Sequence, residues 1–364
     1  MTLSLYFIWR FTKVVAGVFV IFFGILMLID IVEQLRRFSD TGIGLTDAAT
    51  LAVLNVPSSL YRILPLIFIL AAIALFLSLA RSSELVIVRA SGRSGLRFLM
   101  APVSAALILG VAFVAIFNPF VAATSKQYDA FYTRQARGAD NTLSINESGL
   151  WLRQGGLEGQ VVIRAARSDL EGTRLFGTTF LIHDAEGLPA SRIEAEEAEL
   201  SPGAWALRNA KTWDLTASNP EAAARIEETS RLGSDLTREG IRDSFGEPSV
   251  IPIWTLPDYI ERLELAGFSA RPYRVWFQME LALPLLLASM VLIAAGFTMR
   301  HARFGKSGQM VLFALLGGFG MFFLRNFAQV LGDNGQIPVA LAAWTPPVAA
   351  VLLSLGLLLH VEDG

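Results

Sequence analysis

Apolar residues in this chain gather in six long stretches, with one polar region between the third and the fourth. Each stretch is about as long as a helix must be to cross the ~30 Å hydrocarbon layer of a membrane. The pattern therefore predicts six membrane-spanning helices, three before and three after the polar region. They cover residues 14–31, 63–80, 98–123, 275–299, 310–331 and 338–359.

The polar region changes from helical periodicity to alternation. Every second residue from Phe176 to Ile182 is predicted to face one side of a strand, and residues 184–187 follow as a turn. Such spacing favours an antiparallel sandwich or roll. The shorter predicted strands are 150–152, 161–163, 192–195 and 205–215. Residues 219–246 are charged and weakly patterned, so their structure stays open. A short amphipathic helix at the membrane surface is predicted for residues 256–263.

Composition supports this class, because 53% of the residues are hydrophobic and 17% are charged, against roughly 25% charged in soluble proteins. Four arginines and one acid occupy the loop 81–97, three basic residues follow at 300–306, and Arg10 and Lys13 stand near the N-terminus. Positive loops stay inside. Both termini are therefore predicted to be cytoplasmic. Residues 126–271 contain 16 basic and 23 acidic residues, the rest of the chain 14 and 9, so the polar region is predicted to be extracytoplasmic.

Sequence signals for enzyme chemistry are weak. The net charge of −2 excludes a basic nucleic-acid-binding protein, and the absence of cysteine excludes disulfides and thiolate metal sites. Gly305-Lys306-Ser307 ends like a phosphate-binding loop, but Arg300 stands where that loop needs its first glycine. The three histidines belong to separate regions. No catalytic residue, metal or cofactor is predicted, and an intramembrane hydrolase using Asp30, Glu33 or Glu280 is a weak alternative.

Charged residues within the spans are functional candidates because they are costly there. Two acids and two bases close the first span: Asp30, Glu33, Arg36 and Arg37. Glu280 and Arg325 are each predicted to lie roughly 9 Å below the outer boundary. They either form an ion pair between neighbouring helices or face a wet cavity independently. All these charges fall in the outer half, which suits an amphiphile with an anionic headgroup.

The loop 81–97 also contains a predicted short helix. Ser83 is a possible cap, Glu84 lies in the first turn, an apolar stripe follows, and Gly92 ends the segment. On the cytoplasmic side this helix would suit docking against a soluble motor subunit. The alternative is a surface-lying amphipathic helix without a partner.

Three segments resemble the lipopolysaccharide export permeases LptF and LptG. Residues 81–92, Arg-Ser-Ser-Glu-Leu-Val-Ile-Val-Arg-Ala-Ser-Gly, are similar to the family's S-E-L/I-x-x-x-x-A-S/C-G segment. Residues 32–37, Val-Glu-Gln-Leu-Arg-Arg, resemble the end of its first helix, and 337–346 resemble the start of its last span. The order of spans and β-region covers the whole chain, and residues 256–273 are closer to the LptG branch.

This resemblance implies an architecture and a set of partners. The fold would be six transmembrane helices, three and three, around an inserted all-β, jellyroll-like periplasmic domain. The implied domains are 1–125, with a coupling helix at 82–94, then 126–255 and 256–364. The implied partners are an LptF-like permease, an LptB-like ATPase dimer that hydrolyses the ATP, a single-span LptC-like protein and an LptA-like periplasmic bridge. Together they would extract lipopolysaccharide from the outer leaflet of the bacterial inner membrane.

The resemblance also implies two sets of site residues. Coupling to the ATPase is expected of Ser83, Glu84, Arg89 and Gly92. Contact with lipopolysaccharide is expected of Asp30, Arg36, Arg37 and Arg325 and, along a cavity, of Phe22, Phe23, Leu26, Phe322, Phe323 and Phe327. Asp30 departs from the family, since some LptG proteins have lysine there, and it is expected to pair with an arginine or to face a divalent cation. The main alternative function is a membrane scaffold whose β-domain recruits partners.

Overall fold

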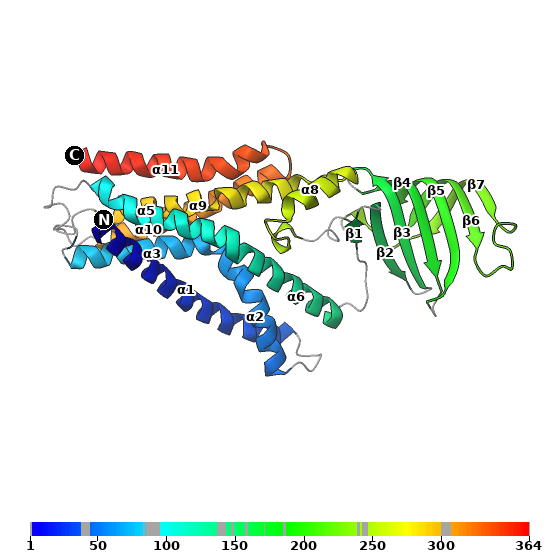
Figure 1. Cartoon of the computed structure of the whole chain (residues 1–364), viewed down its shortest axis with the longest axis horizontal. Coiled ribbons are helices and arrows are strands. Elements are labelled where there is room, and N and C mark those ends of the chain that lie inside the picture. The colour runs from blue at the N-terminus through cyan, green and yellow to red at the C-terminus, as the bar shows by residue number, and fades with distance from the viewer. Residues whose placement is uncertain are drawn as a thin grey trace. The chain divides into compact units, whose positions relative to one another are not determined.

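A computed structural model of the whole chain divides into two compact units (Figure 1). The helical unit comprises Met1–Tyr128, Ile251–Trp254 and Arg274–Gly364, and the β unit comprises Asp129–Val250 and Thr255–Tyr273. The residues that the structure describes are 2–37, 44–82, 84, 95–136, 143–146, 149–156, 159–170, 172–184, 187–238, 241, 247–299 and 307–363.

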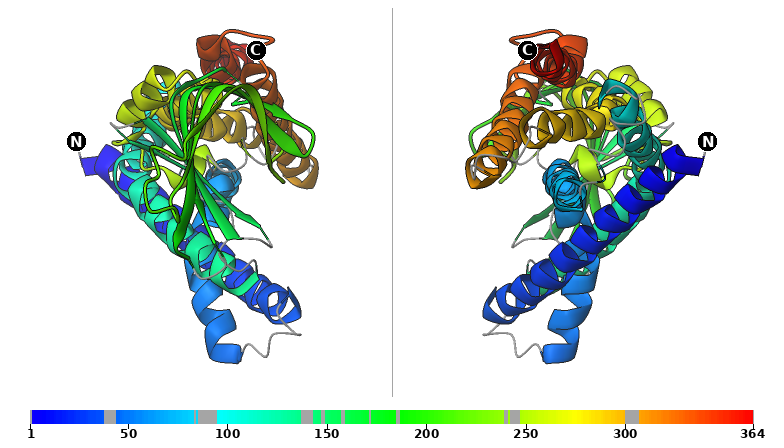
Figure 2. Two further views of the ribbon diagram at one scale, coloured as in Figure 1. Left: turned by 90° about the vertical axis from the view of Figure 1, so that its right-hand side faces the viewer. Right: turned by 90° about the vertical axis from the view of Figure 1, so that its left-hand side faces the viewer.

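Long helices account for most of the chain outside the sheet. They are α1 (Thr2–Arg37), α2 (Leu45–Arg62), α3 (Leu64–Arg81), α5 (Gly95–Ala112), the π-helix η2 (Phe113–Phe117), α6 (Asn118–Ala136), α9 (Arg271–Thr298), α10 (Ser307–Asp333) and α11 (Val339–Asp363). Among the described residues, six helical stretches are long and apolar enough to cross a membrane: Ser4–Arg37, Leu64–Arg81, Arg97–Phe131, Arg271–Thr298, Gly308–Asp333 and Val339–His360. The six predicted helices are thereby confirmed, and α1 extends well beyond its predicted start as one continuous rod (Figure 2, right).

The helix α2 was not predicted. It buries one face, which includes Leu51, Val56 and Leu60, and it ends just before Ile63. Pro65 stands in the first turn of α3, where its missing N–H costs no hydrogen bond, so the chain starts a new helix there rather than continuing α2. The second predicted span is thus the second part of a helix that is broken at Ile63.

The centre of the helical unit is formed by α3 and α9. In their most apolar windows 61% and 78% of the residues are buried, against 6% in α1 and 17% in α10. Phe68 and Phe76 of α3 are among the largest fully buried side chains. Exposed apolar surface as extensive as that of α1 and α10 suits contact with lipid or with another subunit rather than with water.

Close packing of α5 on α9 depends on a glycine. A β-carbon added at Gly110 would lie 2.6 Å from the Cα of Pro284, so no larger residue fits without moving a backbone. Small residues at such contacts let membrane helices approach closely and gain van der Waals attraction.

The β unit contains one antiparallel sheet whose seven described strands follow the chain in order. They are β1 (Leu143–Asn146), β2 (Gly149–Gly156), β3 (Gly159–Ser168), β4 (Arg174–His183), β5 (Pro189–Ser201), β6 (Ala204–Asp214) and β7 (Arg225–Gly233). The five predicted strands coincide with β2 to β6 and are confirmed, although 205–215 runs one residue past the end of β6. β7 was missed because its side chains are mostly exposed and charged, so no alternation marks it. The described strands form a meander, and closure into a roll stays a prediction.

One prediction about β4 was wrong. Leu175, rather than Phe176, is buried together with Thr178 and Phe180. Gly177 lies between them with a φ of +60°, in the left-handed region, so the inward-facing set moves by one residue at this point. β6 changes phase in the same way at Asn209, which has a φ of 50°.

The predicted short helix is confirmed as α8 (Leu256–Leu265), and its place at the membrane surface stays a prediction. Gly267 follows it with a φ of +92°, and a β-carbon there would lie 2.0 Å from the carbonyl oxygen of Ser168. Ser168 N donates to the Ala266 carbonyl at 2.8 Å. Glycine therefore lets the end of α8 contact β3 directly.

Candidate functional site

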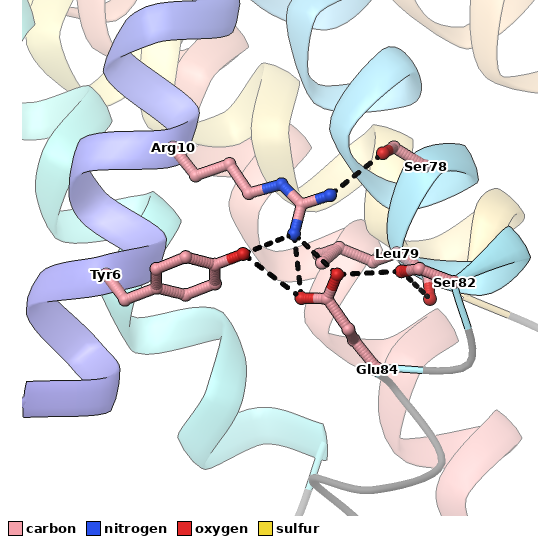
Figure 3. Close-up of polar contacts among 6 residues, drawn as sticks. All are labelled: Tyr6, Arg10, Ser78, Leu79, Ser82 and Glu84. Atoms are coloured by element: carbon pink, nitrogen blue, oxygen red, sulfur yellow. Dashed lines mark hydrogen bonds and ion pairs between the residues drawn. The ribbon is translucent and has the colours of Figure 1, made fainter.

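A polar cluster surrounds Glu84 at the end of α3 (Figure 3). Arg10 Nη1 donates to both carboxylate oxygens of Glu84 at 2.7 Å, and Ser82 Oγ donates to Oε1 at 2.8 Å. Tyr6 OH completes the cluster at 3.5 Å from Oε2. The other predicted coupling residues lie outside the described residues: Ser83, Arg89 and Gly92. Among the four residues expected to couple to the ATPase, the structure therefore describes Glu84.

Arg10 holds α1 to α3 as well as to Glu84. Its Nη2 donates to Ser78 Oγ at 3.0 Å, and its Nη1 also donates to Tyr6 OH at 2.7 Å. Burial alone would raise the pKa of Glu84, but hydrogen bonds from Arg10 and Ser82 outweigh it and hold that pKa below its usual range. Glu84 is thus an anion at neutral pH, and the side chains of the pair are 24% and 28% exposed. In the sequence, Arg10 is marked only as a positive charge that indicates the cytoplasmic side of the membrane. Its contact with Glu84 was not predicted.

Two exposed arginines close the other end of α1. Arg36 lies 3.2 Å from a carboxylate oxygen of Glu33, and Arg37 lies 3.7 Å from the other. Glu33 therefore pairs with both arginines along the helix, three and four residues on. With the Arg36 side chain 80% exposed, its guanidinium has donors to offer an anionic ligand beyond this weak surface pair.

Asp30 has partners other than those expected. Asn55 Nδ2 of α2 donates to its Oδ1 at 2.8 Å, and Gln34 Nε2 lies 3.5 Å from its Oδ2. Gln34 is itself buried and donates to Tyr128 OH of α6 at 3.1 Å. In the described part of the chain the hydrogen bonds of Asp30 thus go to amides rather than to an arginine, and they tie α1 to α2.

The predicted cavity side chains divide between two helices. Phe23, Phe323 and Phe327 are exposed, at 40%, 73% and 53%. The other three are half-buried: Phe22, Leu26 and Phe322. The described packing of α1 runs to α2, α3 and α5, and that of α10 to α3 and α11. The exposed rings, Phe23 on α1 and Phe323 and Phe327 on α10, therefore face outward, whereas Phe22 and Leu26 pack against the core of the helical unit.

Glu280 is completely buried among polar side chains of the helical unit. Tyr61 OH donates a short hydrogen bond to Oε2, and Asn118 Nδ2 donates to the same oxygen at 3.3 Å. Oε1 has no hydrogen-bond partner among the described residues. Arg325 interacts with this carboxylate electrostatically, but the described contacts contain no direct ion pair between them. Of the two alternatives, the direct ion pair is thus absent from the described contacts, and Glu280 instead accepts from two neutral donors that were not predicted.

Asn118 lies where a proline disturbs the third span. Pro119 has no N–H to donate to the Ala115 carbonyl four residues earlier, and the π-helix η2 occupies this place. The Trp254 indole N–H donates to that carbonyl at 3.1 Å, while Ile253 N donates to Asn118 Oδ1 at 3.0 Å. An Asn-Pro pair within an apolar span is the signal that could have identified this network.

Known proteins resemble the chain over nearly its whole length. A family model described as "Lipopolysaccharide export system permease LptF/LptG" matches residues 5–360. The lipopolysaccharide export system permease protein LptG of Escherichia coli K12 is 26% identical over 336 residues, which cover 92% of this chain and 91% of that protein. The LptG of Haemophilus influenzae is 23% identical over 345 residues, covering 93% of each.

Proposed function

Because the chain belongs to the lipopolysaccharide export system permease LptF/LptG family, we propose that it is the LptG-type permease subunit of an ABC exporter. Such a subunit extracts lipopolysaccharide from the outer leaflet of the inner membrane and passes it to a periplasmic bridge. The observation that carries the proposal is the family match across residues 5–360, and the six candidate spans and the separate sheet agree with it. The proposed partners are an LptF-like permease, an LptB-like ATPase dimer, an LptC-like protein and an LptA-like bridge.

The proposed orientation follows from charge. The Arg-rich loop 81–97, here called the connector, lies in the cytoplasm together with both termini, and the acidic β unit lies in the periplasm. Three spans precede the β unit and three follow it, and the sheet closes into a jellyroll-like roll. Glu84 then lies on the side where ATP is hydrolysed, and Arg36 and Arg37 lie near the outer leaflet.

The proposed mechanism is a rigid-body one. Closure of the ATPase dimer moves the connector that contains Glu84, and a cavity lined by α1 and α10 narrows, so that the acyl chains are pushed toward the periplasm. Arg36, Arg37 and Arg325 attract the anionic headgroup. The exposed aromatic rings of α1 and α10 supply apolar walls for the acyl chains. Both helices contact α3 within this chain, and the second permease subunit completes the cavity between their exposed faces.

Reconstituted transfer tests the proposal. The full chain is assembled with its four partner types in proteoliposomes, and arrival of lipopolysaccharide on the LptA-like acceptor is measured by photo-cross-linking. Transfer should require hydrolysable ATP. Glu84→Ala should reduce transfer per ATP or assembly with the ATPase, whereas Glu228→Ala, an exposed glutamate of β7, should not. An assembled complex that hydrolyses ATP without transferring lipid would favour the scaffold alternative.

A further inference from the structure

The contacts of Arg10 join three segments of the chain at one point. Its two terminal nitrogens bind Glu84, Tyr6 on its own helix and Ser78 on α3 (Figure 3). A planar guanidinium with several fixed donors can hold this geometry, whereas a lysine ammonium is a single point of attachment. The start of the connector is therefore fixed to α1 and α3 at once.

Glu84 has little remaining capacity for another ligand while this cluster is formed. One carboxylate oxygen accepts from Arg10 and Ser82, and the other accepts from Arg10 and Tyr6. These four contacts come from three donor groups, since Arg10 Nη1 reaches both oxygens, and they fill most of the roughly four lone-pair positions of a carboxylate. Its negative charge is thus used within the chain, and the orientation of the residue depends on Arg10.

The helix that holds Arg10 also carries the arginines expected to contact lipid. α1 runs without a break from Thr2 to Arg37, so Arg10 lies near one end and Arg36 near the other, roughly 39 Å apart at 1.5 Å per residue. Described packing of α1 on α2, α3 and α5 leaves most of its apolar surface exposed. A displacement applied at Arg10 therefore moves the far end of the same rod.

We infer that Arg10 is a positioning residue that fastens the Glu84 end of the connector to α1, so that movement of the connector is passed along α1 to its lipid-contacting end. This inference rests on the proposed function, since it deepens the coupling step. It assigns the N-terminal part of α1 a role that the resemblance gave to the connector alone.

The test uses Arg10→Gln in the full chain, assembled with all partners in proteoliposomes. Co-purified ATPase, ATP hydrolysis and lipopolysaccharide transferred per ATP are measured together. Assembly and hydrolysis should persist, and transfer per ATP should fall about tenfold. A tenfold fall is the smallest effect expected when a hydrogen bond to a charged group is lost. Lys13→Gln is the matched control, because Lys13 lies on the same helix with its ammonium over the Trp9 ring, 5.0 Å from its centre. It should leave the ratio unchanged.

Charge exchange separates coupling from a merely structural role. Arg10→Glu and Glu84→Arg should each uncouple transfer, and the double variant should recover most of it. Arg10→Lys keeps the ion pair with Glu84 but loses the hydrogen bond to Ser78. Its transfer per ATP should therefore lie between that of wild type and that of Arg10→Gln. If Arg10→Gln does not accumulate in the membrane, recovery of both accumulation and transfer by the double variant supports the inference.

Two results would overturn the inference. One is a wild-type transfer ratio in Arg10→Gln, and the other is a double variant that accumulates and assembles yet transfers no more lipid than the single variants. Neither touches the proposed function, which fails instead if the wild-type complex shows no ATP-dependent transfer.

Discussion

Two glutamates in the helical unit are held in opposite ways. Glu84 is partly exposed and pairs with a guanidinium, while Glu280 is fully buried and accepts hydrogen bonds from the neutral donors Tyr61 and Asn118. A pair near water can open and re-form at small cost, because solvent replaces the lost contact. A buried carboxylate cannot exchange its partners in this way, because only its hydrogen bonds within the protein compensate for the lost contact with water. Breaking the contacts of Glu84 should therefore cost less folding stability than breaking those of Glu280.

The same substitution at both positions gives the largest expected contrast. Glu280→Lys places an unpaired ammonium in a buried site near Arg325, and we expect it to destabilise the protein by about 3–5 kcal/mol, the cost of an uncompensated buried charge. Glu84→Lys should cost about 1 kcal/mol or less. Thermal unfolding and the yield of monodisperse protein in detergent measure this. Equal losses at the two positions would contradict the comparison.

Removing one hydroxyl beside each glutamate tests the contrast between Glu84 and Glu280 more finely. Tyr61→Phe takes the short hydrogen bond from buried Glu280 and should cost about 1–3 kcal/mol, because a buried acceptor loses a donor. Tyr6→Phe is the matched control, since its hydroxyl accepts from Arg10 and lies 3.5 Å from the partly exposed Glu84, where water can replace it, and its loss should stay within about 0.5 kcal/mol. Unfolding midpoints of the two variants decide. A larger loss of stability for Tyr6→Phe than for Tyr61→Phe would contradict this ranking of the two glutamates.

A third glutamate, Glu33, extends the comparison to the exposed end of α1. Its partner Arg36 has an 80% exposed side chain in a weak surface pair, and Arg37 lies one residue further along, so we expect this positive end of α1 to attract a lipid phosphate. Replacing both with glutamate should reduce photo-cross-linking of α1 to lipopolysaccharide roughly tenfold, as expected for a lost charge-assisted contact. Lys13→Glu, near the opposite end of the helix, should leave it unchanged. Undiminished cross-linking would reduce the two arginines to orientation signals.

Acidification should produce the smallest effect. Because the pKa of Glu84 is lowered in the folded protein, its pair with Arg10 contributes stability above the unfolded-state pKa near 4.5, and this is lost as the pH falls through the lower folded value. The loss should be below about 1 kcal/mol, as for other partly exposed pairs. Unfolding midpoints of wild type and Glu84→Gln should converge in this range. A gap that widens toward acid would have the wrong sign.

Sequence patterns predicted the elements far better than the contacts between them. Six apolar runs and five alternating segments correspond to helices and strands because burial in lipid or in a sheet imposes a period on the sequence. β7 follows backbone pairing to β6 and carries no such period. The phase change at Gly177 depends on a single backbone angle. Local pattern contains neither piece of information.

The candidate site was partly predictable for the same reason. Glu84, Arg36 and Arg37 stand in recognisable motifs, whereas Tyr61, Asn118 and Arg10 act through partners 74 to 219 residues away in the chain. Matched depth left an ion pair between Glu280 and Arg325 open beside two independent residues, and the described contacts contain no such pair. Depth limits which groups can meet, but side-chain geometry selected the neutral donors.

The sidedness of the chain tests the central claim most directly, because a coupling role for Glu84 requires the cytoplasmic side. The protein has no cysteine, so Ser4→Cys on α1 and Ser218→Cys in the β unit each introduce one thiol, at exposed positions. In intact spheroplasts an impermeant maleimide should label Ser218→Cys and leave Ser4→Cys unlabelled until the membrane is opened. Labelling of Ser4→Cys from outside, with Ser218→Cys protected, would contradict the account.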